Sequence, residues 1–393
     1  MHNPGSRMDQ ATKKRKNEDP LGIYVHIPFC VRKCFYCDFN SGPLSESARR
    51  LYLGALQEEI RNTPWRNCPA RTMFLGGGTP SELTIVELQD LVTALTQAFP
   101  FEEDAEWSIE CDPGTMSRTF FPDLRELGFN RISLGVQSFN DSHLRALGRI
   151  HNAEEARDAY RAFRQAGFDN VNLDLIFALP GQTLGEWRSD LEEAICLSPE
   201  HLSLYNLTIE PGTEFGNRLA GGMLEEADED LAADMYELAM DLTRAGGYQQ
   251  YEISNYSRPG RECAHNHIYW SNQPYLGFGV SASSFVRGSR WTQTASLTEY
   301  ARTASSPRVT RASEEKLNDR EALGEAIMLG LRTEEGISPA ALSNRYCYDV
   351  ASLFSQTFET LGQNGFLYQE GEKIRLTRRG KMMANDVCAL FLA

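Results

Sequence analysis

The sequence has few of the features that mark membrane, nucleic-acid-binding or disulfide-rich proteins. No apolar run approaches the roughly 18 residues that cross a bilayer, so no membrane span is expected. Positive charge is scarce, because 39 lysines and arginines against 54 aspartates and glutamates give a formal net charge of −15. Such a protein repels phosphate backbones, which argues against nucleic acid as a partner. Nine cysteines in 393 residues do not suggest a disulfide scaffold, and a cytoplasmic protein is expected.

The first 20 residues have no apolar periodicity and carry a basic run from Lys13 to Lys16. No apolar segment follows these charges, as it would in a signal peptide, so residues 1–20 are expected to be a disordered tail. The remaining chain is long enough to bury a large core, as one large domain with a smaller one.

From Leu21 onward, short β-rich runs alternate with helical stretches, a pattern that predicts βα units around a parallel sheet. Six units are fewer than the eight that close a full barrel, so an open, partial (β/α)6 barrel is expected. Its functional residues should lie in the loops after the strands. One of its helices should begin with a capping box formed by Thr84 and Glu87. The strands are expected at 23–27, 72–75, 107–110, 131–136, 171–177 and 201–207.

A seventh strand-like run at 249–254 precedes a segment rich in His, Asn, Tyr and Trp. After Ser305 and Pro307 the composition becomes polar and charged, which suggests a linker. The expected fold class is α/β, with the partial barrel at 21–305 and a small winged-helix-like α+β module at 306–393. In that module, helices are expected at 319–331, 338–344 and 350–364, then a hairpin of 366–368 and 373–376, and a last helix.

Three cysteines follow the first expected strand at the spacing C-x3-C-x2-C: Cys30, Cys34 and Cys37. Three thiolates on one short loop can hold three irons of a [4Fe-4S] cube and leave the fourth iron open to a small molecule. Structural zinc prefers four protein ligands, commonly as two separated pairs, and no second pair matches here. The spacing therefore predicts an iron–sulfur cluster.

This motif after the first strand of a six-unit βα domain resembles the signature of the radical S-adenosylmethionine (SAM) superfamily. The resemblance implies that the open iron chelates the amino and carboxylate groups of SAM. It also implies that further residues bind SAM, among them a glycine run whose missing Cβ atoms let a ligand approach the backbone. The implied SAM-binding residues are Tyr24, Tyr36, Gly77, Gly78, Thr79, Glu110, Gln137, Arg149 and Asp174.

The stretches HIPFC, GGGTPS, ECDPGT, GVQSF, DLIFALPGQ and IEPGT resemble one branch of this superfamily. That branch contains oxygen-independent coproporphyrinogen III dehydrogenase and its haem-chaperone relatives. The dehydrogenase has a further cysteine where this chain has Phe39, and a longer N-terminal extension. Both departures favour the haem-chaperone group, often called HemW-like. Oxidative decarboxylation of coproporphyrinogen III is the alternative function, and a binding module with a purely structural cluster is the third hypothesis.

The segment from Cys263 to Trp270 contains H-N-x-x-Y-W, the haem-binding signature of the chaperone group. The resemblance implies haem contact by His265, Tyr269 and Trp270. His265 is the candidate axial iron ligand, with His267 and Cys263 in reserve, since imidazole and thiolate both ligate haem iron. The segment follows the last expected strands, so it should lie on the side of the barrel where ligands enter.

The function expected from the sequence is therefore that of a haem chaperone with a [4Fe-4S] cluster, SAM and haem. Its expected partner is a haem-acceptor protein, and the assignment allows transient contact with membrane haem proteins. The haem propionates would need local bases such as Arg258, Arg261, Arg287 or Arg290. The sequence does not decide whether SAM is turned over, and so whether the protein is an enzyme.

Overall fold

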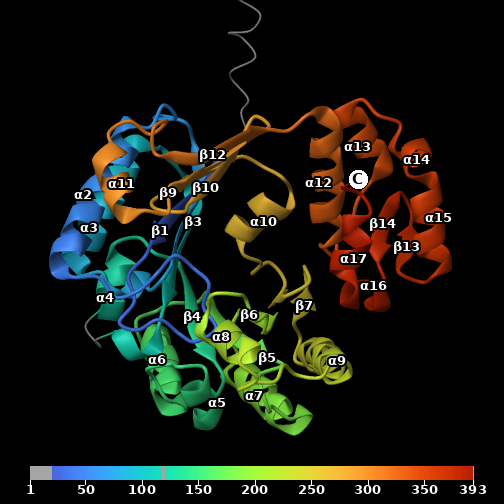
Figure 1. The fold of residues 1–393 in the computed structure, drawn as a ribbon, viewed down its shortest axis with the longest axis horizontal. Helices are drawn as coiled ribbons and strands as arrows, with labels where there is room; N and C mark the ends of the chain where they lie inside the picture. The colour runs from blue at the N-terminus through green and yellow to red at the C-terminus, as the bar shows by residue number, and fades with distance from the viewer. Residues whose placement is uncertain (1–19, 117–119, 393) are drawn as a thin grey trace, which may run out of the picture.

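The computed structural model describes residues 20–116 and 120–392. Apart from residue 20, the predicted tail at 1–20 lies outside the described residues. The chain forms two lobes, a large sheet flanked by helices and a smaller lobe made from the C-terminal residues (Figure 1). Within the described ranges, no helix is both long and apolar enough to cross a membrane.

Six parallel strands form the centre of the sheet in sequence order, so the six expected strands are confirmed. The predicted capping box is also present at the start of α3. The side chains of Thr84 and Glu87 each accept a hydrogen bond from the backbone N–H of the other residue. The strands are β1 (Leu21–Ile27), β2 (Ala70–Gly77), β3 (Phe101–Cys111), β4 (Arg131–Gln137), β5 (Val171–Phe177) and β6 (His201–Asn206). The helices between and after them are α2 (Glu46–Asn62), α3 (Ile85–Ala98), α4 (Phe120–Glu126), α5 (Asp141–Ala146), α6 (Ala153–Gln165), α7 (Leu184–Leu197), α8 (Glu214–Ala220) and α9 (Glu229–Ala245).

The sheet continues at both edges and has twelve strands in all among the described residues. At the β1 edge, one strand pairs in parallel with β1 and three more follow antiparallel. These strands are β9 (Tyr275–Phe278), β10 (Ser283–Val286), β11 (Ser289–Gln293) and β12 (Arg311–Lys316), with α11 (Leu297–Thr303) between the last two.

Strand β12 shows that the predicted linker after Ser305 is wrong for residues 311–316. This strand is mostly exposed, and main-chain pairing with β11 holds it at the sheet edge. The Arg311 guanidinium adds a contact over the Trp291 ring, 4.0 Å from its centroid. An exposed edge strand needs no alternation of apolar residues, so its polar composition carried no strand signal.

The predicted strand at 249–254 is also wrong as one element. It divides into β7 (Gln249–Gln250) and β8 (Asn255–Ser257), which pair antiparallel. Between them the Glu252 carboxylate accepts hydrogen bonds from the Ser254 backbone N–H, at 3.0 Å, and from the Asn255 side chain. These bonds fold the chain back on itself and break the run.

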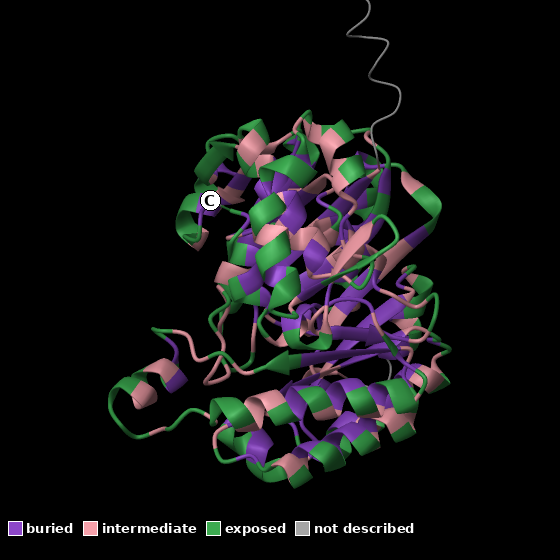
Figure 2. Cartoon of the chain, turned by 90° about the vertical axis from the view of Figure 1, so that its right-hand side faces the viewer, coloured by how far each residue is buried: buried purple, intermediate pink, exposed green. Residues whose placement is uncertain are grey.

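The main core lies between the sheet and the helices that cover it, where buried residues gather on the facing surfaces (Figure 2). Parallel strands covered on both faces are apolar almost throughout, as β5 illustrates. Trp187 of α7 is fully buried against Phe177 at the end of β5, with ring centroids 5.3 Å apart. Its indole N–H donates to the Met235 carbonyl at 2.9 Å, so the ring packs without an unsatisfied donor.

The C-terminal lobe has its own core, to which Leu323, Ile327 and Leu331 of α12 contribute one helix face. The predicted hairpin is present, while the predicted helix at 350–364 is interrupted at Phe354 and the last helix is divided at Met383. The elements are α12 (Asp319–Leu331), α13 (Pro339–Tyr346), α14 (Val350–Leu353), α15 (Ser355–Gln363), β13 (Leu367–Glu370), β14 (Lys373–Leu376), α16 (Arg378–Met382) and α17 (Ala384–Ala389).

Candidate functional site

The carboxyl ends of the parallel strands surround a cavity of about 470 Å³. The cysteine loop after β1 forms one wall and is closed at its base, where the Cys30 backbone N–H donates to the Gly42 carbonyl at 3.1 Å. Of the residues predicted for the cluster and SAM, only Tyr24 is not in the cavity wall; its ring stacks on Phe74 inside the barrel. The predicted residues that line the cavity are Cys30, Cys34, Tyr36, Cys37, Gly77, Gly78, Thr79, Glu110, Gln137, Arg149 and Asp174.

Each of the three cysteine sulfurs has a polar neighbour that could stabilise a thiolate. The Thr79 hydroxyl donates to Cys30 Sγ at 3.5 Å, Arg149 Nη1 donates to Cys34 Sγ at 3.4 Å, and Ser41 Oγ lies 3.9 Å from Cys37 Sγ. Burial raises the pKa of Cys30 and of Cys37, which favours neutral thiols until a metal displaces the protons.

The three thiols fit a cluster better than a single ion. In the described part of the chain, no three His, Cys, Asp or Glu side chains are placed to hold one metal ion. In a cubane cluster each thiolate binds a different iron, so the sulfurs surround the cluster and need not meet at one point. Three thiols on one loop beside a cavity match a cluster with one open iron.

The glycine run at the end of β2 lets this strand pass close to the cysteine loop. Gly77 has φ of +115°, and a Cβ there would lie 2.5 Å from the His26 ring. A Cβ on Gly78 would lie 2.5 Å from the Phe29 carbonyl oxygen and 3.0 Å from Cys30 Sγ. Because His26 Nε2 also contacts the Asn40 carbonyl oxygen at 3.0 Å, bulk at Gly77 would disturb the loop itself.

Two carboxyl groups face the cavity from β3 and β5. Burial, and then the neighbouring Asp174, raise the pKa of Glu110 to about 7. The Gly77 backbone N–H donates to Glu110 at 2.9 Å. Burial also raises the pKa of Asp174, which accepts bonds from Ser133 at 2.9 Å and Asn172 at 2.8 Å. A cationic ligand would favour the ionised forms, so this wall suits a ligand that carries positive charge.

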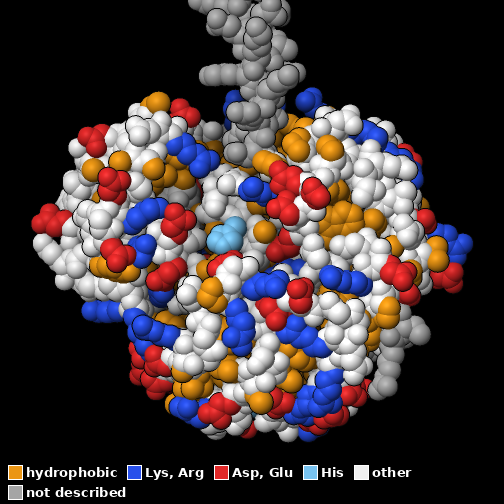
Figure 3. All heavy atoms as spheres, turned by 180° about the vertical axis from the view of Figure 1, so that it is seen from behind, with side chains coloured by type: hydrophobic (Ala, Val, Ile, Leu, Met, Phe, Trp, Pro, Cys, Tyr) orange, Lys and Arg blue, Asp and Glu red, His pale blue; other side chains and the backbone are white. Residues whose placement is uncertain are grey.

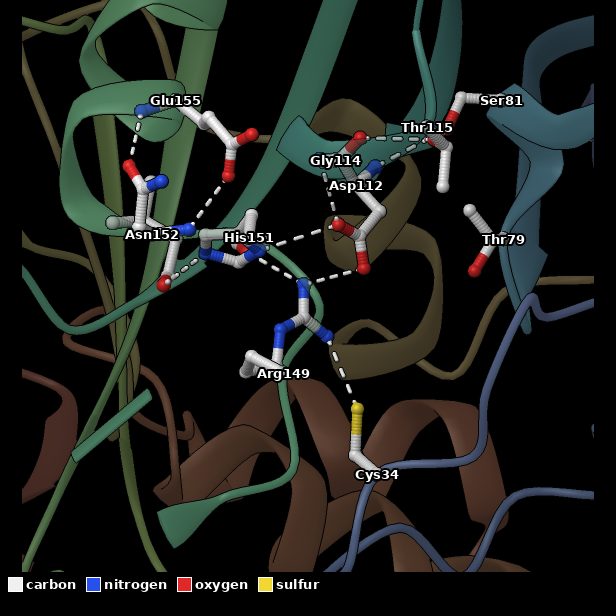
Figure 4. A network of polar contacts seen from close by, with 12 residues as sticks. Cys34, Thr79, Ser81, Asp112, Gly114, Thr115, Arg149, His151, Asn152 and Glu155 are labelled. Carbon is white, nitrogen blue, oxygen red and sulfur yellow. Dashed lines mark hydrogen bonds and ion pairs between the residues drawn. The ribbon is translucent and has the colours of Figure 1, made fainter. Parts of the chain in front are cut away.

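Arg149 joins the cavity wall to the cluster loop (Figure 4). Its Nη2 pairs with Asp112 at 2.7 Å and donates to the Gly135 carbonyl at 2.9 Å. Burial alone would raise the pKa of Asp112, but Arg149, supported by His151 and the Gly114 N–H, holds it below its usual value. The ion pair therefore keeps a fixed positive charge beside Cys34.

Gln137 ends β4 in a strained conformation, with φ of +66° and a register shift in the pairing with β5 after Gly135. Positive φ at a residue other than glycine often marks a functional position. The positive φ coincides with a position in the cavity wall, which Gln137 shares with Ser133 and Gly135 of the same strand.

The sequence analysis missed other cavity residues. Those on strands could have been found from the alternation of side chains, since Ser133 and Gln137 share one face of β4. Glu210 lies in the IEPGT stretch, which was already noted as a motif. The missed residues include Ser133, Gly135, Tyr205, Asn206, Thr208 and Glu210.

We expect Glu110→Gln to stabilise the cluster-free protein in mildly alkaline solution. In the folded protein the pKa of Glu110 is about 7, above its ordinary value of 4.5. The ionised carboxylate therefore lowers the free energy of unfolding as the pH rises between these two values, and below pH 4.5 this loss is absent. The variant should exceed the wild type by less than about 1 kcal/mol at pH 5 and by on the order of 3 kcal/mol at pH 8. Urea unfolding at both pH values measures this difference. Exposed Glu126→Gln is the control, and equal stability of wild type and Glu110→Gln at pH 8 would contradict the prediction.

The predicted haem segment forms α10 (Ala264–Trp270) at the other end of the barrel, so its expected placement on the ligand-entry side is wrong. His265 contacts Thr72 Oγ1 at 2.7 Å, near the start of β2, whereas the cluster cavity begins at Gly77. Thr72 and Gly77 are five residues apart on β2, which corresponds to about 16 Å along the strand. The reason is topological: β9 runs parallel to β1, so the segment just before β9 must lie at the amino ends of the strands.

The signature residues of α10 divide between two environments. His265 is 1% exposed, stacks on Phe74 with centroids 5.2 Å apart, and contacts the Tyr269 hydroxyl at 2.7 Å. Trp270 instead lines a second cavity of about 460 Å³, between α10 and the C-terminal lobe. Viewed from behind, a histidine shows in the hollow between the lobes (Figure 3). Among the histidines in the described part of the chain, only His267 is not buried, and it lines this cavity.

The fold and the cysteine-lined cavity define a radical SAM protein. Residues 24–194 match the model of the Radical SAM superfamily, and residues 317–383 match the HemN C-terminal domain. The solved structure of coproporphyrinogen III oxidase (HemN) from Escherichia coli, described as a radical SAM enzyme, superposes with a TM-score of 0.85. It is 25% identical in sequence, and the match covers 98% of this chain and 93% of that one.

The most informative relatives in sequence are curated haem chaperones. The protein named heme chaperone HemW from Escherichia coli is 38% identical over 387 residues, which cover 95% of this chain and 98% of the relative. The HemW of Lactococcus lactis is 36% identical over 375 residues, with the same coverage. This chain belongs to the HemW family.

Proposed function

We propose that this protein is a haem chaperone, which binds haem and passes it to an acceptor protein, and that it carries a [4Fe-4S] cluster and SAM. The observation that carries the proposal is the separation of α10 from the cysteine cavity by about 16 Å along the strands. Haem bound beside α10 would stay away from the open iron, which suits storage and transfer of an intact porphyrin. The HemW relatives support the same function.

The residues of the cavity at the carboxyl ends support binding of the cluster and of SAM. Cys30, Cys34 and Cys37 would hold the cluster, which supplies one-electron chemistry and an open iron. The carboxyl groups of Glu110 and Asp174 provide a wall for a positively charged ligand. Arg149 keeps a positive charge beside the sulfur of Cys34, where it would stabilise the anionic thiolate.

The likeness to HemN favours oxidative decarboxylation of coproporphyrinogen as the second candidate. Phe39, in the place of the dehydrogenase's further cysteine, lines the cysteine cavity and is 60% exposed. A phenyl ring there offers neither a metal ligand nor a group that transfers protons. This difference argues for the chaperone.

We expect the wild-type protein to bind haem and to lack coproporphyrinogen turnover. After anaerobic reconstitution, one sample is titrated with haemin and another aliquot is incubated with coproporphyrinogen III, SAM and a reductant. The expected result is about one haem per chain and no protoporphyrinogen above a control without SAM. Phe39→Cys should not gain turnover. Failure to bind haem would refute the chaperone function, and turnover by the wild type would establish the second candidate.

A further inference from the structure

The cavity between α10 and the C-terminal lobe offers a candidate iron ligand that is not a fixed position of the haem signature. In H-N-x-x-Y-W, His267 occupies a variable position. The structure places this histidine, together with Trp270, in the wall of the cavity. We infer that His267, and not His265, is the axial ligand of haem, and that haem lies in this cavity between the two lobes. This inference rests on the proposed haem-binding function.

His265 is unsuited to ligate iron because both of its ring nitrogens are already engaged. Nδ1 contacts Thr72 Oγ1 and Nε2 contacts the Tyr269 hydroxyl, each at 2.7 Å. The ring is also covered by Phe74 on one side. These contacts help to attach α10 to the amino end of β2, so His265 could bind iron only by giving up a bond that positions the helix.

Cys263, the other reserve ligand, is also enclosed. It is buried, and its thiol donates to Glu106 at 3.4 Å. Burial, and then Glu106, raise the pKa of Cys263 to about 12, so the thiolate that iron needs is disfavoured.

His267 lies on the opposite face of the same helix, since positions two apart on a helix point in different directions. Among the described residues, neither of its ring nitrogens has a hydrogen-bond partner. Its ring stacks on Tyr251, with centroids 5.1 Å apart and an angle of 28°. The Tyr251 hydroxyl contacts His201 at 2.9 Å, so the stacking surface is itself fixed. An imidazole that is oriented by stacking and whose ring nitrogens are not engaged by other side chains has the geometry of an axial ligand.

The cavity also has the chemistry that a porphyrin requires. Its volume of about 460 Å³ lies within the range of cofactor sites, roughly 300–1,000 Å³. The Trp270 ring and the side chains of Ile337 and Leu342 provide apolar surface for the macrocycle. Arg345 and Lys373 also line it and could pair with propionates.

The charges at the rim make Arg345 the stronger candidate of these two bases. Lys373 already pairs with Glu335 at 2.8 Å, and Glu262 and Glu334 also line the cavity. Arg345 donates to the Asn272 carbonyl, at 3.2 Å, through Nη2. The arginines suggested from the sequence, Arg258, Arg261, Arg287 and Arg290, are not in the cavity wall.

The test is haemin titration of His267→Ala beside His265→Asn, which retains a side chain able to bond to Thr72. Loss of the axial ligand should weaken haemin affinity about tenfold or more and shift the Soret band, while His265→Asn should retain the wild-type spectrum. Imidazole added to His267→Gly should restore the Soret band, because it can occupy the vacated space. Circular dichroism and the cluster absorption verify folding in each variant.

A second probe tests the orientation of haem. Arg345→Met should weaken binding of haemin severalfold but not binding of haemin dimethyl ester, which has no propionate charge. Equal haemin affinity and spectra for His267→Ala and the wild type would overturn the inference and leave the chaperone function standing. Absence of haemin binding by the wild type would instead refute the proposed function.

Discussion

Cys34→Ala is expected to remove the iron–sulfur cluster, lowering bound iron from about four atoms per chain to nearly none. The three cysteines come from a single loop, and the cube would lose a third of its protein ligands. Cys111 also lines the cavity, but it is buried, and burial followed by Glu110 and Asp112 raises the pKa of its thiol. It is therefore a poor replacement. Iron and sulfide analysis, absorption and EPR after anaerobic reconstitution measure the loss.

Cys30→Ser and Cys37→Ser should give the same result, since each thiolate would bind a different iron. Cys196→Ser is the matched control, because Cys196 is exposed on α7 and outside the cavity. Full iron content in all three loop variants would contradict the cluster assignment. So would tetrahedral zinc, with no iron, in the wild-type protein.

Arg149→Met should cause the second large effect, a loss of about 3–5 kcal/mol in the free energy of unfolding of the cluster-free protein. The substitution leaves Asp112 buried without its nearest cation, which lies 2.7 Å away in the wild type. It also removes the donor to Cys34 Sγ and the bond to the Gly135 carbonyl. Methionine has a comparable length, so the change tests charge and hydrogen bonding more than packing.

The same effect should depend on pH. The pKa of Asp112 lies below its ordinary value of 3.8, so the ion pair contributes stability above that pH, and the contribution is lost as the pH falls through the lowered pKa. The difference between wild type and variant should therefore narrow in acid. Urea unfolding at pH 7 and pH 3 measures this, with Arg161→Met as the control, because solvent screens the exposed pairs of Arg161 with Glu154 and Asp158 and they contribute little to stability. A loss at pH 7 no larger than that of the control would refute the role given to Arg149.

The central strands were predictable because a parallel sheet covered on both faces needs continuous apolar runs with turn residues between them. The run at 171–177, for example, coincides with β5. Edge elements lacked such a signal. β12 is polar and exposed, and the turn that divides β7 from β8 depends on a local bond from the Glu252 side chain. Strand β12 and the division into β7 and β8 could be assigned only once the strands with which they pair were known.

The cysteine spacing and the residues at the strand ends were sufficient to predict one cavity, because parallel strands bring their carboxyl ends to a common edge whatever the details of packing. The position of α10 could not be obtained in this way. It follows from the return of β9 parallel to β1, a contact between segments that are about 250 residues apart in the sequence. The motif H-N-x-x-Y-W says which residues occur together but not which face of a helix each occupies. Only the tertiary structure turns His265 into the barrel and leaves His267 in the cavity between the lobes, because the barrel end and the C-terminal lobe pack against opposite faces of the same short helix.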